Sequence, residues 1–276
     1  MDRNISKNPE QNKANFFKKK TTEELERELP LYEGLLYTDR IEEIQKRKRI
    51  INTVENFYNS LRKYQNHRFM SWEHCFNAFQ SPTHSNDLDY LSLQLAFYLA
   101  SWGMYRGSSG LLWKDYKIHI DTVKIIQKYE RIHCSAENEI DESQIDVIFQ
   151  AKEDIKKNYE KIEYFRPTKG GDKKYKISAT DTLVTKILLG TLGCVPAYDR
   201  LLRIGFDEAT DAKIGKSFSK KSLRSLFAFI DNNRPAFEEV KAKINKDGIH
   251  YPLMKIVDMY FWELGFQKNP ELVEKE

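Results

Sequence analysis

A single carboxylate stands where two apolar segments of the chain meet. The stretch ILLGTLGCVPAYDRLLRIG runs from Ile187 to Gly205, and its one acidic residue is Asp199. Asp is favoured immediately before a helix, where its side chain accepts a backbone N–H, so helix capping alone explains the residue type. A carboxylate held rigidly between apolar walls can also stabilise a cationic transition state or activate a water molecule. The residues alone leave both interpretations open.

Two groups of cations flank this segment in the sequence. The first, RPTKGGDKKYK from Arg166 to Lys176, has five basic residues and one acid, and its glycines let backbone N–H groups approach an anion closely. The second runs from Lys213 to Arg224 with no acid inside it. A solvated surface explains either group alone, whereas two groups around one carboxylate favour a phosphate backbone as the partner. The predicted phosphate-binding residues are Lys169, Gly170, Gly171, Lys173, Lys174, Lys216, Lys220 and Lys221.

The elements that must position these residues are predicted to be helices. Apolar residues recur at helical spacing along most of the chain, and no segment shows the alternation of a strand convincingly. One helix is expected from Asp141 to Phe165. Two separate helices are expected at 222–230 and 235–244, because Pro235 suits a first helical turn. The predicted fold class is therefore all-α, a compact multi-helix fold.

Size and composition limit the class of protein further. The chain has 276 residues, a net charge of +4 and three widely spaced cysteines. We expect a flexible basic arm over 1–20 and one helical domain over 21–276, with a division into lobes at 21–165 and 166–276 as the alternative. Neither the cysteines nor the histidines have metal-ligand spacing, so no metal and no cofactor are expected. The absence of long apolar runs predicts a soluble protein with no membrane partner. The odd number and wide spacing of the cysteines favour a reducing cytoplasm, and a monomer is expected.

The segment TDTLVTKILLGTLGCVPAYDRLLR resembles the end of the helix-hairpin-helix DNA glycosylase core. In that superfamily a helix runs into a short P-V-D-like segment, whose Asp opens the next helix and assists cleavage of the bond between base and deoxyribose. The resemblance implies that Asp199 is catalytic and that DNA is the partner. The usual L-x-G-x-G hairpin is missing, and KGGDKKYKIS stands nearest to it. No lysine is clearly placed for lyase chemistry, with Lys169 and Lys186 as alternatives, so base removal without strand cleavage is expected.

Two further stretches, FYLASWGMYRGSSGLL and YPLMKIVDMYFWELGF, are similar to a small bacterial group that resembles antiphage DNA glycosylases. Those enzymes remove glucosylated hydroxymethylcytosine from phage DNA, so the resemblance implies modified phage DNA as partner and a role in antiphage defence. A flipped base needs stacking and edge contacts. The predicted base-pocket residues are Trp102, Tyr105, Arg106, Ser108 and Tyr198.

Each of these interpretations has an alternative that involves no catalysis. Trp102 and Tyr105 can belong to the core, and Lys255 and Asp258 read first as an ordinary ion pair within a helix, with a place in the pocket floor as the second interpretation. For the whole protein, the alternative to an enzyme is a non-catalytic helical nucleic-acid-binding protein of a defence system. A third possibility is an interaction protein whose aromatic residues cover a protein interface.

Overall fold

The computed structural model describes residues 20–29, 35–106, 109–134, 141–210, 213–245 and 250–271, and within them the fold is mostly helical. The all-α prediction is confirmed. The helices are α2 (Thr22–Glu28), α3 (Leu35–Lys63), α4 (Ser71–Gln80), α5 (Leu88–Ser101), α6 (Ile120–Gln127), α7 (Glu142–Glu160), α8 (Asp181–Thr191), α9 (Arg200–Ala209), α10 (Lys220–Ile244) and α11 (Leu253–Lys268), with short 3₁₀ turns between some of them. The predicted arm lies outside the described residues, apart from Lys20.

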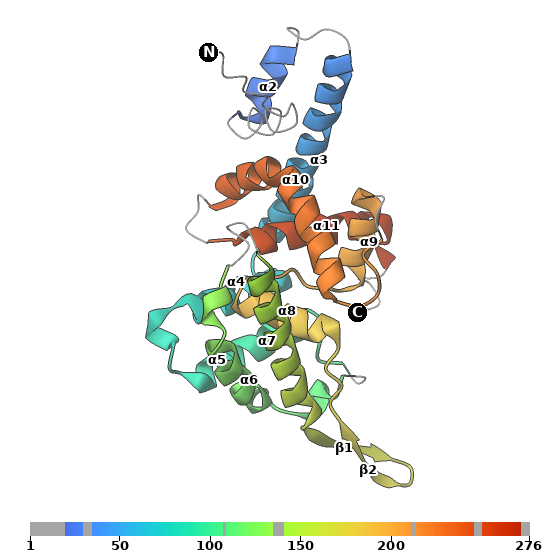
Figure 1. The fold of residues 1–276 in the computed structure, drawn as a ribbon. Helices are drawn as coiled ribbons and strands as arrows, with labels where there is room; N and C mark the ends of the chain where they lie inside the picture. The colour runs from blue at the N-terminus through green and yellow to red at the C-terminus, as the bar shows by residue number, and fades with distance from the viewer. Residues whose placement is uncertain are drawn as a thin grey trace, which may run out of the picture.

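The helices gather in two groups (Figure 1). Long α3 packs with α10 and α11, and α9 lies along α11, whereas α4 to α8 form the other group. One continuous cluster of buried apolar side chains runs through both groups. No helix among the described residues is both long enough and apolar enough to cross a membrane.

Two glycines allow α9 and α11 to touch backbone to backbone. A Cβ atom at Gly205 would lie 1.9 Å from the carbonyl oxygen of Phe261, and one at Gly265 would lie 2.1 Å from that of Leu201. Each helix therefore needs a residue without a side chain where the other crosses it. This close crossing fixes the start of α9, which carries Asp199 as its N-cap, relative to α11.

A β-hairpin replaces the end of one predicted helix. Helix α7 stops at Glu160, and strands β1 (Glu163–Thr168) and β2 (Gly171–Lys176) follow as an antiparallel pair. The helix prediction to Phe165 was wrong because Tyr164 and Tyr175 pair across the hairpin with ring centroids 5.5 Å apart, which stabilises strands. The hairpin extends away from the helices (Figure 1).

Helix α10 is continuous, although two helices were predicted in its place. Pro235 lies inside it, where a proline removes one backbone hydrogen bond. Ile230 and Phe237, on either side of the proline, are fully buried. Packing of both halves of α10 into the same core therefore outweighs the local preference for a break.

Candidate active site

Asp199 lies at a pocket that draws on both groups of helices. The pocket has a volume of about 440 Å³, within the range of roughly 300–1,000 Å³ of small-molecule sites. It is lined by Arg68, Phe69, Ala100, Ser101, Trp102, Gly103, Met104, Arg106, Thr182, Lys186, Asp199, Arg200, Leu201, Arg203 and Trp262. The predicted residues that it brings together are Asp199, Trp102 and Arg106, together with Lys186.

The two oxygens of Asp199 have different partners. Oδ1 accepts the backbone N–H of Leu202 at 2.9 Å, which makes Asp199 the N-cap of α9. The capping interpretation is thus confirmed. Oδ2 lies 3.5 Å from Nζ of Lys186, and the Asp199 side chain is 15% exposed. A carboxylate has about four lone-pair positions, so capping leaves Asp199 able to accept from a ligand.

Lys186 is the basic partner of Asp199 inside the pocket. It comes from the middle of α8, and its side chain is only 5% exposed. Its ammonium group also donates to the backbone carbonyl of Trp102 at 3.2 Å and lies 5.0 Å from the centroid of that indole ring. A buried ammonium needs such partners to offset its lost hydration.

Aromatic rings form one side of the pocket. Phe69 stacks on Trp102 with centroids 4.3 Å apart, and Trp262 meets both rings edge-on. The indole Nε1–H of Trp102 is buried and has no hydrogen-bond acceptor among the described residues. Trp102 and Trp262 are only 5% and 7% exposed, so the partly exposed Phe69 is the ring open to a planar ligand.

Four arginines line the same pocket: Arg68, Arg106, Arg200 and Arg203. Arg203 donates from Nε to the backbone carbonyl of Asp199 at 3.3 Å. The guanidinium of Arg68 lies 4.6 Å from the centroid of the Phe69 ring. Together with Lys186, these side chains set five cations against one carboxylate in the lining. An anionic ligand is therefore favoured electrostatically.

Two predicted base-pocket residues do not line this pocket, and a third cannot be placed. The Tyr105 hydroxyl lies 2.7 Å from Nε2 of His119, whose Nδ1 contacts the Tyr159 hydroxyl. The Tyr198 hydroxyl donates to the carbonyls of Ile214 and Gly215. Both tyrosine hydroxyl groups therefore already have hydrogen-bond partners within the fold. Ser108 lies outside the described residues.

The buried histidine in this chain is held uncharged. His119 is fully buried, and burial lowers its pKa to about 3. In the neutral ring one nitrogen donates and the other accepts, which matches the two tyrosine hydroxyls. The same burial raises the pKa of Tyr105 to about 12, with the charge of Asp115 adding to it. These groups stay neutral at physiological pH.

The first cation group is carried by the hairpin, and among the described residues Lys174 is its one member in an ion pair. Lys169, Lys173 and Lys174 are exposed, and Lys174 pairs with Glu163 at 2.6 Å. The N–H of Gly170 donates to the Thr168 side chain, so this amide is already used within the turn. The hairpin therefore offers side-chain cations for an anion rather than a cradle of backbone amides.

The second cation group is largely balanced by acids of the fold. Lys213 pairs with Asp207 at 3.7 Å, Lys220 pairs with Asp146, and Arg224 makes a bidentate pair with Glu142. Lys216 and Lys221 are exposed. Sequence spacing could not reveal these acids, since they come from α7 and α9. The hairpin is therefore the stronger cationic surface.

A second acid lies close to Asp199 but outside the pocket lining. Asp258 on α11 is 2% exposed, and Lys255 is its partner at 2.8 Å. Burial raises the pKa of Asp258, the charge of Asp199 raises it further, and the charge of Lys255 opposes the rise. The two carboxylates are thus near enough to influence each other.

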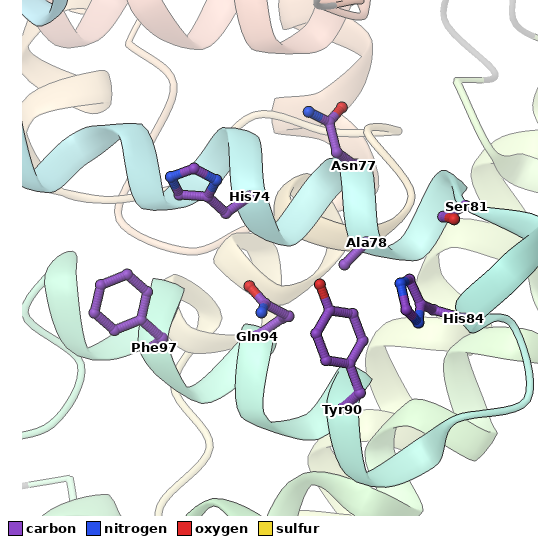
Figure 2. A pocket seen from close by; sticks show the side chains of 8 residues that line it. All are labelled: His74, Asn77, Ala78, Ser81, His84, Tyr90, Gln94 and Phe97. Carbon is purple, nitrogen blue, oxygen red and sulfur yellow. The ribbon is translucent and has the colours of Figure 1, made fainter. Parts of the chain in front are cut away.

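Another pocket lies between α4 and α5, and no acid, lysine or arginine is among the described residues that line it (Figure 2). Its volume is about 420 Å³, and its lining residues are His74, Asn77, Ala78, Ser81, His84, Tyr90, Gln94 and Phe97. Figure 2 shows His84 beside the Tyr90 ring, and their centroids are 4.2 Å apart. Without a carboxylate, this pocket cannot perform the chemistry considered for Asp199.

Comparison with protein-family models, with curated proteins and with solved structures finds no match. Among the described residues, no group of three His, Cys, Asp or Glu side chains is arranged to hold a metal ion. The chemistry of the pocket must therefore be argued from its own side chains.

Proposed function

We propose that this chain is a monofunctional DNA glycosylase in which Asp199 is the catalytic carboxylate. The observation that carries the proposal is the composition of the Asp199 pocket: one carboxylate, a wall of stacked aromatic rings and four arginines. A flipped nucleotide presents the matching groups, namely a planar base and a phosphate on each side of its sugar. The exposed cations of the hairpin would contact further phosphates of the DNA.

In the proposed reaction the base leaves with the electron pair of the bond to C1′ of deoxyribose. The sugar passes through an oxocarbenium-like state, whose positive charge the Asp199 carboxylate stabilises. A water molecule then adds to C1′ and gives its proton to Asp199 or to solvent. The departing base takes up one proton from solvent, which balances the proton lost by the water, and the products are the neutral free base and an abasic site. Phe69, which stacks on Trp102 and is partly exposed, would stack on the base.

The substrate proposed from the resemblance is glucosylated hydroxymethylcytosine in phage DNA, and the role is blocking phage replication in the cytoplasm. Several hydrogen-bond donors in the pocket suit a hydroxyl-rich sugar, since guanidinium groups carry five N–H donors each. Arg106 and Arg68 line the pocket and would supply such donors. The protein is proposed to act as a monomer.

The test is abasic-site formation on DNA carrying glucosylated hydroxymethylcytosine and on unmodified DNA, read by strand cleavage in alkali. The Asp199→Asn variant should lose base excision and keep its fold and DNA affinity, because Asn caps helices as well as Asp does. A matched control is Asp141→Asn. Asp141 is likewise an N-cap aspartate, at the start of α7, but it is exposed and does not line the pocket.

The outcomes separate the enzyme from its alternative. Excision by wild type and Asp141→Asn, but not by Asp199→Asn, supports the enzyme. Wild-type protein that binds DNA yet releases no base from a panel of modified and damaged substrates contradicts it. The non-catalytic nucleic-acid-binding protein then becomes the better description, with Asp199 as a helix cap only.

A further inference from the structure

A second ion pair lies buried behind the Asp199 pocket. Nζ of Lys255 and Oδ2 of Asp258 are 2.8 Å apart on α11, and both side chains are 2% exposed. Removing two charges from water costs free energy, which the pair regains only if its remaining hydrogen-bonding groups are also satisfied. The other contacts of each partner therefore indicate why the pair is kept.

The second oxygen of Asp258 holds the segment that leads into Asp199. Oδ1 accepts the backbone N–H of Ala197 at 2.9 Å. The carbonyl of Ala197 in turn accepts the backbone N–H of Asp199 at 2.8 Å. Asp258 is thus connected to Asp199 through a single residue. The contact joins α11 to the turn between α8 and α9.

The neighbouring amide of the same turn is fixed from the other side. The N–H of Tyr198 donates to Oγ1 of Thr185 on α8 at 2.8 Å, and that hydroxyl donates to the carbonyl of Asp181 at 2.7 Å. Three consecutive backbone amides, 197 to 199, therefore each have a defined acceptor. Asp258 is the only one of these acceptors that carries a charge.

The ammonium group of Lys255 lies among aromatic rings. Its Nζ is 4.7 Å from the ring centroid of Trp102, 5.2 Å from that of Trp72 and 5.7 Å from that of Phe57. Such rings attract a cation that has lost its water. Trp102 also lies against Lys186, the partner of Asp199. One indole is therefore shared by the two lysines that neutralise Asp199 and Asp258.

We propose that Asp258 is a positioning residue for Asp199, with Lys255 as the counter-ion that keeps Asp258 charged in the core. The inference rests on the proposed function, because it assigns the ion pair to the setting of the Asp199 carboxylate. Asp258 fixes the Ala197 amide, and the Ala197 carbonyl fixes Asp199. A displacement of about 1 Å at a reacting group can cost two orders of magnitude in rate.

The experiment compares two variants that both lack the ion pair. Lys255→Met/Asp258→Asn keeps an oxygen that can accept from Ala197, whereas Lys255→Met/Asp258→Leu keeps the volume but has no acceptor. Neither leaves an unpaired charge in the core, so both are expected to fold. We expect the kcat for base excision to be at least about ten-fold lower in the Leu variant than in the Asn variant. The KM for DNA should agree within about two-fold, because neither change touches the lining of the pocket.

Hydrogen–deuterium exchange of the peptide that covers 195–199 measures the order of this turn independently of any enzymatic activity. The Leu variant should exchange faster in this peptide than the Asn variant, while peptides elsewhere in α9 and α11 exchange alike. Equal exchange in 195–199 overturns the positioning role, whether or not the protein excises a base. Where wild-type protein excises a base, equal kcat values in the two variants overturn it too.

If wild-type protein excises nothing and the exchange difference is present, the proposed function fails while Asp258 is still shown to position Asp199.

Discussion

Lys186 and Asp199 form an ion pair inside the candidate site, with Nζ and Oδ2 3.5 Å apart and side chains 5% and 15% exposed. The ammonium also donates to the carbonyl of Trp102. Both contacts use the ammonium group as a donor. A charged ammonium has no lone pair, so it cannot attack a sugar carbon while the pair persists.

From this pair, the proposed glycosylase is expected to remove a base without cleaving the strand. Borohydride should trap no covalent complex between wild-type protein and substrate DNA, and abasic sites should stay uncleaved until alkali is added. Lys186→Met should lower excision at least ten-fold, because the Asp199 carboxylate loses its counter-charge and its position. A borohydride-trapped complex that disappears in Lys186→Met would contradict this and make Lys186 a nucleophile.

DNA affinity should depend more on the hairpin than on the start of α10. For Lys169→Ala/Lys173→Ala, the slope of log Kd against log salt should fall by about two, since each phosphate contact contributes about one. The matched control is Lys216→Ala/Lys221→Ala, a pair of equally exposed lysines in the group that acids of the fold largely balance. Its slope should change less. A larger loss in the control pair would place the main phosphate contacts there instead.

The crossing of α9 and α11 should not tolerate a methyl group. Gly205→Ala brings a Cβ to 1.9 Å from the Phe261 carbonyl oxygen, so we expect a loss of about 3 kcal/mol or more in the free energy of unfolding. In an exposed helix the same change stabilises by up to about 1 kcal/mol. Gly170→Ala is the control, because nothing lies within 4 Å of its added Cβ. Urea unfolding measures both, and similar midpoints for the two variants would show that the helices can separate.

Acid should weaken the fold through His119. Its pKa of about 3 in the folded chain is below the value of about 6.5 expected when unfolded. Between these values the unfolded chain binds the extra proton. The free energy of unfolding therefore falls as the pH drops below about 6.5, by up to about 1.4 kcal/mol per pH unit. Urea unfolding of His119→Gln at a series of pH values should lack this slope. A slope equal to that of wild type would assign the acid sensitivity to other groups.

Local signals predicted the joint at Asp199 but not the whole pocket. The N-cap could be predicted because capping depends on the residue type and its immediate neighbours. Phe69 and Trp262 come from segments far away in the sequence, and only tertiary packing brings them beside Trp102. Tyr105 follows Trp102 closely yet turns to His119. The sequence could not predict that the Tyr105 side chain contacts His119 and does not line the pocket.

The hairpin was missed for a different reason. Strand β2 is rich in lysine, and lysine is depleted in strands. A usable signal was the glycine pair at 170–171 between two segments that each contain a tyrosine. At Pro235 the local preference of proline for a first helical turn predicted a break, but packing of both halves of α10 into the core keeps the helix continuous. The prediction at Pro235 failed because long-range packing contributes more free energy there than the local preference of the sequence.

The way the hairpin is attached links it to the candidate site along the chain. Only 177–180 separate β2 from α8, and within them Ile177 and Ala179 are buried. The N–H of Ile177 donates to the carbonyl of Ile162, and Gly110 leaves room for both Tyr164 and Ile177. The base of the hairpin is therefore held in place by the helical part of the fold. Tilting it would twist the first turn of α8, the same helix that carries Lys186.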